Sequence, residues 1–357
     1  MNEINEETYN SYIKIKKQKI LFLVLLSIAL LLIALISIII GSYQLSLKET
    51  IEALFKTTNN QNHELLIWQM RLPRTILAII AGAGLSLSGA IMQTCLKNDL
   101  ASPSTLGITS AATFGANLSI IFFSSSLFSV SILSRFPYLT SLSAFIFSII
   151  VVLIILALSK IKTFTPQTII LAGIAMNSLF QAFTTLIQYF ADQVTLSQAI
   201  FWSFGDLTRG SWTEIFVLLL ITIPITIFFL TKAWDYNSLA TNEDFAKSLG
   251  VSVNKIRLIS ILLAALITSL CVSFLGMISF IGLLGPHIAK KIFGKNHQLL
   301  IPASAIIGAL ILTLADIISR TIVQPIVLPV GAITSFIGAS LFLYILIKGG
   351  KNYAARN

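Results

Sequence analysis

The stretch ILFLVLLSIALLLIALISIII, residues 20–40, contains no charge and is long enough for a helix to cross the hydrocarbon core of a membrane. Residues 141–158 form a second run of this kind. Only 11% of the 357 residues are charged, whereas a soluble domain has roughly 25%. Such long apolar runs, without the short alternating segments of a β-barrel, indicate helices whose backbone groups are paired internally. The sequence therefore predicts an all-α polytopic membrane protein.

The apolar segments predict about ten transmembrane helices in a single bundle over residues 20–347. Residues 1–19 are expected to be an N-terminal cytoplasmic segment, and 348–357 a cytoplasmic tail. Glycines and a proline interrupt the stretch 258–293, so its span boundaries stay open, and a count of eight spans would leave both ends of the chain on the same side. The ten spans are expected near 20–41, 74–95, 105–124, 139–158, 167–190, 212–231, 258–276, 277–293, 300–318 and 330–347.

The net charge of +10 is distributed as a membrane topology signal. Basic residues stand at the ends of apolar runs and do not form a stripe, which argues against nucleic acid as a partner. If both termini lie inside, only seven of the 24 basic residues fall outside. This bias predicts a multi-pass protein of the cytoplasmic membrane with cytoplasmic termini. The seven are Lys48, Lys56, Arg71, Arg74, Arg135, Arg209 and Arg320.

The sequence lacks a phosphate-binding loop, since Gly294-Lys295 is followed by asparagine and has no earlier glycine at the required spacing. We therefore expect no ATP site, no enzymatic activity and no cofactor. Asp316 is the one carboxylate expected within a span, and Arg320 one turn later predicts an intrahelical ion pair. Ion-coupled carriers usually keep several buried carboxylates, so this scarcity favours a pathway powered by another subunit.

Small residues recur every four positions in the second span, at Ala78, Gly82, Ser86 and Ala90. A face of this kind lets neighbouring backbones approach closely, so it predicts dense packing. His287 stands alone near a membrane edge, where a packed or capping role is more common than metal ligation. No metal site is expected.

The fifth span carries three amides, Asn177, Gln181 and Gln188. Amides that face lipid are costly, so they should face protein or a cavity. Hydrogen bonding between helices and the lining of a translocation pathway are both consistent with this pattern.

The inner connection near 234–256 contains a predicted short helix. An asparagine caps its start, acidic residues occupy its first turn, and a glycine ends it. An ordered amphipathic helix in a cytoplasmic loop is suited to docking in a groove of another protein. The residues assigned to this docking are Asn242, Glu243, Phe245, Leu249 and Gly250.

The motif RLPR at 71–74 places two arginines outside, against the charge bias. They can extend along the membrane interface, or they can recognise carboxylates of an acidic partner. The sequence leaves these alternatives open.

Several short motifs follow one another along the chain. They are RLPR at 71–74, the small-residue run at 82–93, LGI at 106–108, LAG at 171–173, WSFGDL at 202–207, FIGLLGPH at 280–287 (which includes Pro286 and His287), ADIISR at 315–320 and LPVG at 328–331. Through these motifs the chain resembles, over nearly its whole length, the permeases of type II ABC importers for ferric siderophores, haem and cobalamin. One departure is Asp99, where the family usually has a proline, and others are Val327 and Ser340.

This resemblance implies a ten-span subunit that pairs with a second permease subunit, identical or different, around a pathway lined largely by the fifth and tenth spans. It implies cytoplasmic ABC ATPase subunits docked on residues 234–256. It also implies an extracytoplasmic substrate-binding protein that meets Arg71, Arg74 and Arg320. The expected cargo is an iron complex such as a ferric siderophore, with haem, cobalamin and molybdate-type oxyanions as alternatives.

Overall fold

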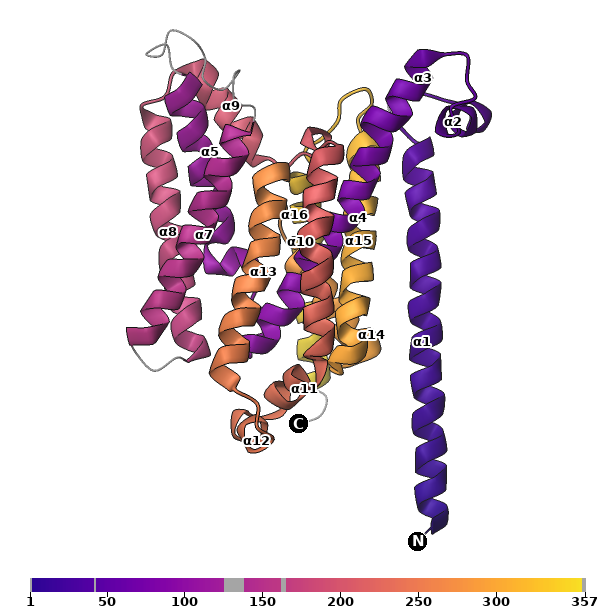
Figure 1. Cartoon of the computed structure of the whole chain (residues 1–357), viewed down its shortest axis with the longest axis vertical. Helices are drawn as coiled ribbons and strands as arrows, with labels where there is room; N and C mark the ends of the chain where they lie inside the picture. Colours follow the sequence, from indigo (N-terminus) through magenta and orange to yellow (C-terminus); the bar gives the residue numbers. More distant parts are fainter. Residues whose placement is uncertain (1, 42, 125–137, 162–164, 355–357) are drawn as a thin grey trace.

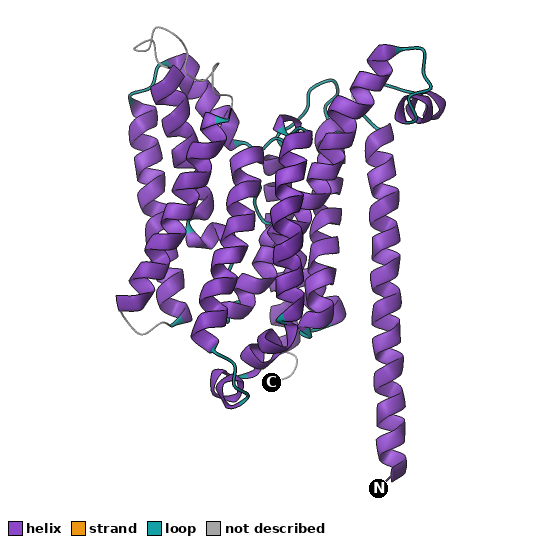
Figure 2. Cartoon of the chain, viewed as in Figure 1, coloured by secondary structure: helices purple, strands orange, loops and turns teal. Residues whose placement is uncertain are grey.

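The computed structural model describes residues 2–41, 43–124, 138–161 and 165–354. All regular structure in these ranges is helical, and no strand occurs in them (Figure 2). The long helices are α1 (Asn2–Ile39), α4 (Leu72–Cys95), α5 (Ile108–Ser124), α7 (Leu139–Ile161), α8 (Pro166–Tyr189), α10 (Trp212–Thr231), α13 (Val253–Leu275), α14 (Ile281–Phe293), α15 (His297–Thr321) and α16 (Val330–Ala354).

Shorter helices lie at the two ends of the bundle and in its connections. They are α2 (Leu47–Leu54), α3 (Gln61–Leu65), the π-helical turn η1 (Leu66–Arg71), the 3₁₀ turn η2 (Pro103–Leu106), α9 (Gln193–Ser203), the 3₁₀ turn η3 (Leu207–Arg209), α11 (Ala233–Thr241) and α12 (Glu243–Ser248). In Figure 1, α2 and α3 lie at one end of the bundle, and α11 and α12 lie at the other.

Seven helical stretches among the described residues are long and apolar enough to cross a membrane, and α5 and α16 contain shorter apolar stretches. The all-α membrane fold is therefore confirmed. The eighth predicted span, 277–293, differs from the structure because α14 starts only at Ile281 and has 13 residues. At about 1.5 Å per residue it is roughly 20 Å long, shorter than the hydrocarbon core of about 30 Å. Its late start follows from Phe280, whose φ of 65° cannot belong to a right-handed helix.

Helix α4 forms the centre of the fold, with α15, α14 and α13 packed around it. Figure 1 shows α5, α7, α8 and α9 on one flank of this centre and α1 on the opposite flank. The small residues predicted to form a packing face, Ala78, Gly82, Ser86 and Ala90, are all buried on α4.

The small side chains of α4 allow backbone contact with two neighbouring helices. A Cβ at Gly82 would lie 2.5 Å from the carbonyl oxygen of Gly308 on α15, and one at Gly89 would lie 1.7 Å from that of Gly282 on α14. Ser86 donates a hydrogen bond of 2.6 Å to the carbonyl of Ser304. Since a larger residue would not fit at these positions, the small residues of α4 are what allows the three helices to approach this closely.

Gly89→Ala should destabilise the bundle by about 3 kcal/mol, the upper end for overpacking, because its methyl group meets a fixed carbonyl. Gly84→Ala on the same helix is the matched comparison, because its Cβ meets a side-chain atom, Ile267 Cγ2 at 2.8 Å, in place of a backbone carbonyl. Ile267 is buried and β-branched, so some strain remains, but a gain in helix propensity of about 1 kcal/mol should make the loss smaller than at Gly89. Thermal unfolding in detergent measures both, and equal losses would contradict the proposed backbone contact.

Candidate functional site

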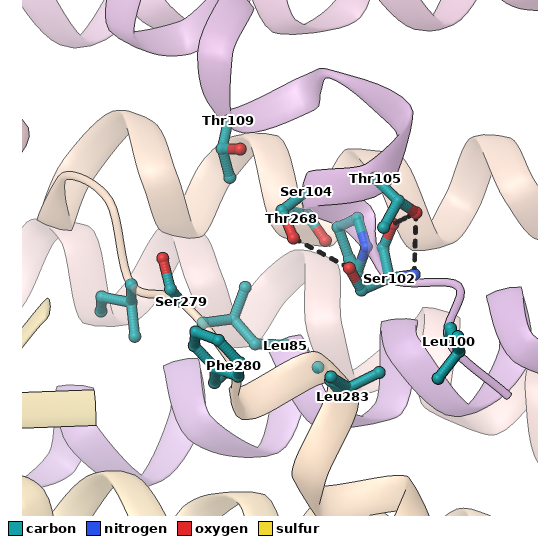
Figure 3. Close-up of a pocket in the computed structure, with 13 residues that line it drawn as sticks. Leu85, Leu100, Ser102, Ser104, Thr105, Thr109, Thr268, Ser279, Phe280 and Leu283 are labelled. Carbon is teal, nitrogen blue, oxygen red and sulfur yellow. Dashed lines mark hydrogen bonds between the residues drawn. The ribbon is translucent and has the colours of Figure 1, made fainter. Parts of the chain in front are cut away.

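A cavity of about 270 Å³ opens where α4, α13, α14 and the α4–α5 connection meet. Hydroxyl groups of the connection face the cavity from one side, and the residues around the start of α14 form the other side (Figure 3). The lining combines neutral polar groups with apolar side chains and has no charged residue among those described. The lining residues are Leu85, Leu100, Ser102, Pro103, Ser104, Thr105, Thr109, Thr268, Ile278, Ser279, Phe280, Gly282 and Leu283.

The α4–α5 connection is folded by its own hydrogen bonds. Thr105 Oγ1 donates to the carbonyl of Ser102 at 2.7 Å and accepts from its amide at 3.1 Å, while the hydroxyls of Ser102 and Ser104 lie 2.8 Å apart. Gly107, with φ of 75°, then separates η2 from α5. The third predicted span, 105–124, therefore begins three residues late, at Ile108.

Phe280 holds an uncommon conformation on the opposite wall. A positive φ in an aromatic residue is costly and persists only where the surroundings enforce it. Gly338 of α16 lies against this residue and leaves room for it, since a Cβ at 338 would lie 2.4 Å from the Phe280 Cβ. The cavity wall is thus fixed by a close contact between α14 and α16.

Charged groups hold the inner end of the connection against α14. Lys290 Nζ lies 2.6 Å from Asp99 Oδ1 and 2.7 Å from Gln93 Oε1. Burial would raise the pKa of the Asp99 carboxyl, but the hydrogen bond and charge of Lys290 outweigh it and hold that pKa below its usual value. Asp99 is therefore ionised at neutral pH and ties the connection to α14.

Two of the three amides on α8 bond to α5. Gln188 Nε2 donates to Asn117 Oδ1 at 2.8 Å, and Asn177 accepts from the hydroxyl of Ser110. Gln181 is exposed on α8, between Ser178 and Thr185 on a polar face of that helix. Interhelical bonding accounts for Asn177 and Gln188, and Gln181 alone points away from the described bundle.

The helix predicted in the inner connection is α12. The Asn242 side chain accepts from the amide of Asp244 at 3.2 Å, and Gly250 has the φ of 81° that ends the helix. Phe245 and Leu249 are 49% and 59% exposed, so this turn presents apolar side chains to its surroundings. Glu243 instead points inward and pairs with Arg257.

At the opposite end of the bundle, buried arginines surround one carboxylate. Arg74 Nε lies 2.7 Å from Asp316 Oδ1, and Arg320 Nη2 lies 2.9 Å from Oδ2. The predicted intrahelical pair is present, and Arg74 extends it to α4. These three residues carry a net charge of +1, and Arg71 beside them adds another positive charge.

Arg71 and Arg320 also bind the end of α1, which the sequence did not reveal. Backbone carbonyls at a helix C-terminus have no partner within the helix, and the two guanidinium groups satisfy several of them. Arg71 Nη1 donates to Ile38 and Ile39 at 2.9 and 2.6 Å, Arg71 Nη2 donates to Tyr43, and Arg320 Nη1 donates to Ser37 and Ile40 at 3.1 and 2.9 Å.

The arginines nevertheless border a pocket at this end of the bundle, the end predicted to lie outside. Arg71, Arg74 and Arg320 line a hollow of about 330 Å³ together with Tyr43 and Gln69. Their internal bonds show that they stabilise the fold, and since each is at most 7% exposed, only a small part of each side chain is accessible from the pocket.

Comparisons with known proteins agree with this arrangement. The model of the FecCD transport family matches residues 29–348. The chain belongs to the FecCD transport family.

The chain is 46% identical to an ABC transporter permease protein of Methanocaldococcus jannaschii, over 93% of this chain and 95% of the relative. It is 34% identical to the iron(3+)-hydroxamate import system permease protein FhuG of Bacillus subtilis, over 91% and 97%. A solved structure described as a metal-chelate type ABC transporter in an inward-facing conformation superposes with a TM-score of 0.80 at 29% identity, covering 92% of this chain and 99% of that one.

In this FecCD-family chain the motif at 280–287 forms part of the cavity. Phe280, Gly282 and Leu283 line it, Pro286 is buried in α14, and His287 is half-buried beside them. The predicted residues do not form one site. The arginines lie at the start of α4 and the end of α15, α12 lies at the opposite end of the bundle (Figure 1), and the amides Asn177, Gln181 and Gln188 of α8 are not among the residues that line the cavity. The cavity itself was not predicted, although the serine and threonine residues that line it are concentrated in the sequence at 102–109.

Asp316→Asn should destabilise the protein by about 3–5 kcal/mol, because it leaves two buried arginines without their carboxylate. The control is Glu52→Gln, which removes the exposed Lys48–Glu52 pair and should cost at most about 1 kcal/mol. Thermal unfolding in detergent compares the two. Equal stability of Asp316→Asn and the wild type would show that the arginine cluster does not support the fold.

Proposed function

We propose that this chain is the membrane-spanning permease subunit of an ABC importer for an iron chelate, a ferric siderophore in the first place. The observation that carries the proposal is the cavity between the α4–α5 connection and α14, in a chain of the FecCD transport family. Its walls come from two different segments, the α4–α5 connection and the start of α14, so a change in their relative position would open or close it. This suits a pathway that opens to one side of the membrane at a time.

The lining suits a bulky, polar ligand. Hydroxyl groups form hydrogen bonds without imposing a charge, and apolar side chains such as Leu85 and Phe280 contact organic parts of a ligand. A chelate brings its metal already coordinated and needs only such contacts. Weak neutral contacts also let the cargo leave, which transport requires. Haem, cobalamin and molybdate-type oxyanions remain the alternatives, and an ion-coupled carrier is a more distant one.

A second permease subunit is proposed to cover α8 and α16. Large apolar side chains are exposed on both helices, among them Leu171 and Tyr189 on α8 and Phe336 on α16. Lipid alone could cover these apolar side chains. However, α8 also exposes the amide of Gln181, and an amide that faces lipid is costly. This favours a protein partner or a polar pathway along α8.

ATPase subunits are proposed to bind α12. Phe245 and Leu249 are exposed apolar side chains on a capped helix, and Trp234 at the start of α11 is exposed beside this region. This is the form of a helix that inserts into a groove of another protein. The chain itself would hydrolyse no ATP.

An extracytoplasmic binding protein is proposed to meet the outer pocket. The arginines there already donate to carbonyls of α1, so an acidic partner would have to replace some of these acceptors. Carboxylates accept stronger hydrogen bonds from arginine than carbonyls do. Docking and the position of the α1 terminus would then be linked.

Reconstituted in vesicles with its ATPase and binding protein, the chain should import radiolabelled ferric hydroxamate only when ATP is present. Excess haemin, cobalamin or molybdate identifies the cargo class by competition. The chain purified alone should show no ATP hydrolysis. Uptake that requires an ion gradient and no ATPase would contradict the proposal.

Leu249→Asp should weaken ATPase binding at least about tenfold, because it places a charge on an apolar contact at the centre of a small interface. Lys255→Gln, an exposed change at the start of α13, should leave the affinity unchanged. Binding of the purified ATPase to permease in nanodiscs measures both variants. Unchanged affinity of Leu249→Asp would remove α12 as the docking helix.

A further inference from the structure

We infer that Arg257, with Glu243, is a positioning residue that transmits movement of α12 to the wall of the cavity. The inference rests on the proposed function, since it assumes that ATPase subunits move α12. It names the side chains through which that movement reaches the cargo pathway.

Arg257 joins three elements through one guanidinium group. It is fully buried near the start of α13, and its Nε donates to the carbonyl of Cys95 at 2.9 Å. Its Nη2 donates to Glu243 Oε1, at the first residue of α12. Lys97 Nζ lies 3.6 Å from the same carboxylate oxygen. The end of α4 and the start of α12 are therefore connected by a single rigid side chain.

Replacing either Arg257 or Glu243 is expected to leave the other side chain as a charge without its ion-pair partner. A buried guanidinium needs a carboxylate to offset its loss of water. Cys95 is the last residue of α4, so its carbonyl oxygen accepts no hydrogen bond from within the helix and needs a donor from another part of the chain. Arginine can serve both at once because its donors point in fixed, separate directions, which lysine cannot reproduce.

The link reaches the cavity through a short segment. Only residues 96–101 separate Cys95 from Ser102, and Leu100 of this segment already lines the cavity with Ser102. Lys290 holds Asp99 on the α14 side. The segment is thus held between Arg257 at its start and Lys290 near its middle, so a shift of α12 acts on the wall that carries the hydroxyl groups.

A second set of contacts ties α11 to the same end of α4. His297 Nδ1 lies 2.8 Å from Asn237 Oδ1, and its Nε2 lies 2.8 Å from Thr94 Oγ1. Tyr236 shares a hydrogen bond of 2.7 Å with Ser260. Both α11 and α12 are therefore linked to the last turn of α4, α11 through His297 of α15 and α12 through Arg257 of α13, so their motion would converge at this turn.

Burial alone would raise the pKa of the Glu243 carboxyl, but the hydrogen bond and charge of Arg257, together with Lys97, hold that pKa below its usual value. A lowered pKa in the folded state means that the pair stabilises the fold above the ordinary pKa of glutamate and is lost only as the pH falls through the lowered value. The link is therefore intact at neutral pH.

The test is the number of ferric hydroxamate molecules imported per ATP hydrolysed by the complete importer in vesicles. Glu243→Gln and Arg257→Lys should lower this ratio about tenfold, as expected for the loss of one charge-assisted hydrogen bond, while ATP hydrolysis continues. The control is Lys247→Gln, which breaks the exposed Lys247–Asp244 pair on the same helix and should leave the ratio unchanged.

Thermal unfolding and ATPase binding of each variant separate this role from a structural one. A parallel fall in hydrolysis and import together with a lower unfolding temperature would show that the pair only holds the fold, and it would overturn the inference. The inference would also be overturned if Glu243→Gln and Arg257→Lys both imported the chelate at the wild-type rate with an unchanged ratio of import to ATP hydrolysis. Failure of the wild type itself to import with ATP would instead overturn the proposed function.

Discussion

The close approach of α4 to α14 and α15 is the contact on which the rest of the structure depends. Gly82 and Gly89 leave no side chain between the backbones, and the small Ser86 side chain bonds to the backbone of α15, so α4 is held at a fixed depth in the bundle. Its last turn then lies against α11 and α13, and the connection that follows it lies against the start of α14. The cavity lies where α4 ends and the hydrogen-bonded α4–α5 connection turns towards the start of α14.

Charges are kept at the two ends of this rigid centre. At one end Asp316 is shared between two arginines, and at the other Glu243 is shared between Arg257 and Lys97. Each carboxylate joins elements that are distant in the chain. In a bilayer, where an unpaired charge is very costly, such pairs also specify which helices can be neighbours. The same pairs are thus suited to coupling the ends of the protein to the pathway between them.

The sequence predicted features that depend on local chemistry. Apolar runs located the helices, four-residue spacing located the packing face of α4, and Asn242 and Gly250 bounded α12 correctly. Features that depend on contacts across the chain were missed. The left-handed Phe280 fits against Gly338, and it shortens α14. Arg71 and Arg320 bind carbonyls of α1, and Arg257 binds Cys95, 162 residues away. No spacing rule reveals such partners, so the sequence predicted only the Asp316–Arg320 pair and left Arg71 between the membrane interface and an external partner.

The two walls of the cavity are expected to move relative to one another when the ATPase binds nucleotide. Spin labels on Leu100→Cys and Leu283→Cys stand on opposite walls, and the native Cys95 and Cys271 are buried and should not react. Pulsed electron resonance on the complete importer in nanodiscs gives the distance between the labels. The distance distribution should change between the nucleotide-free and ATP-bound states. The same distribution in both states, in an importer that hydrolyses ATP, would contradict this movement of the walls.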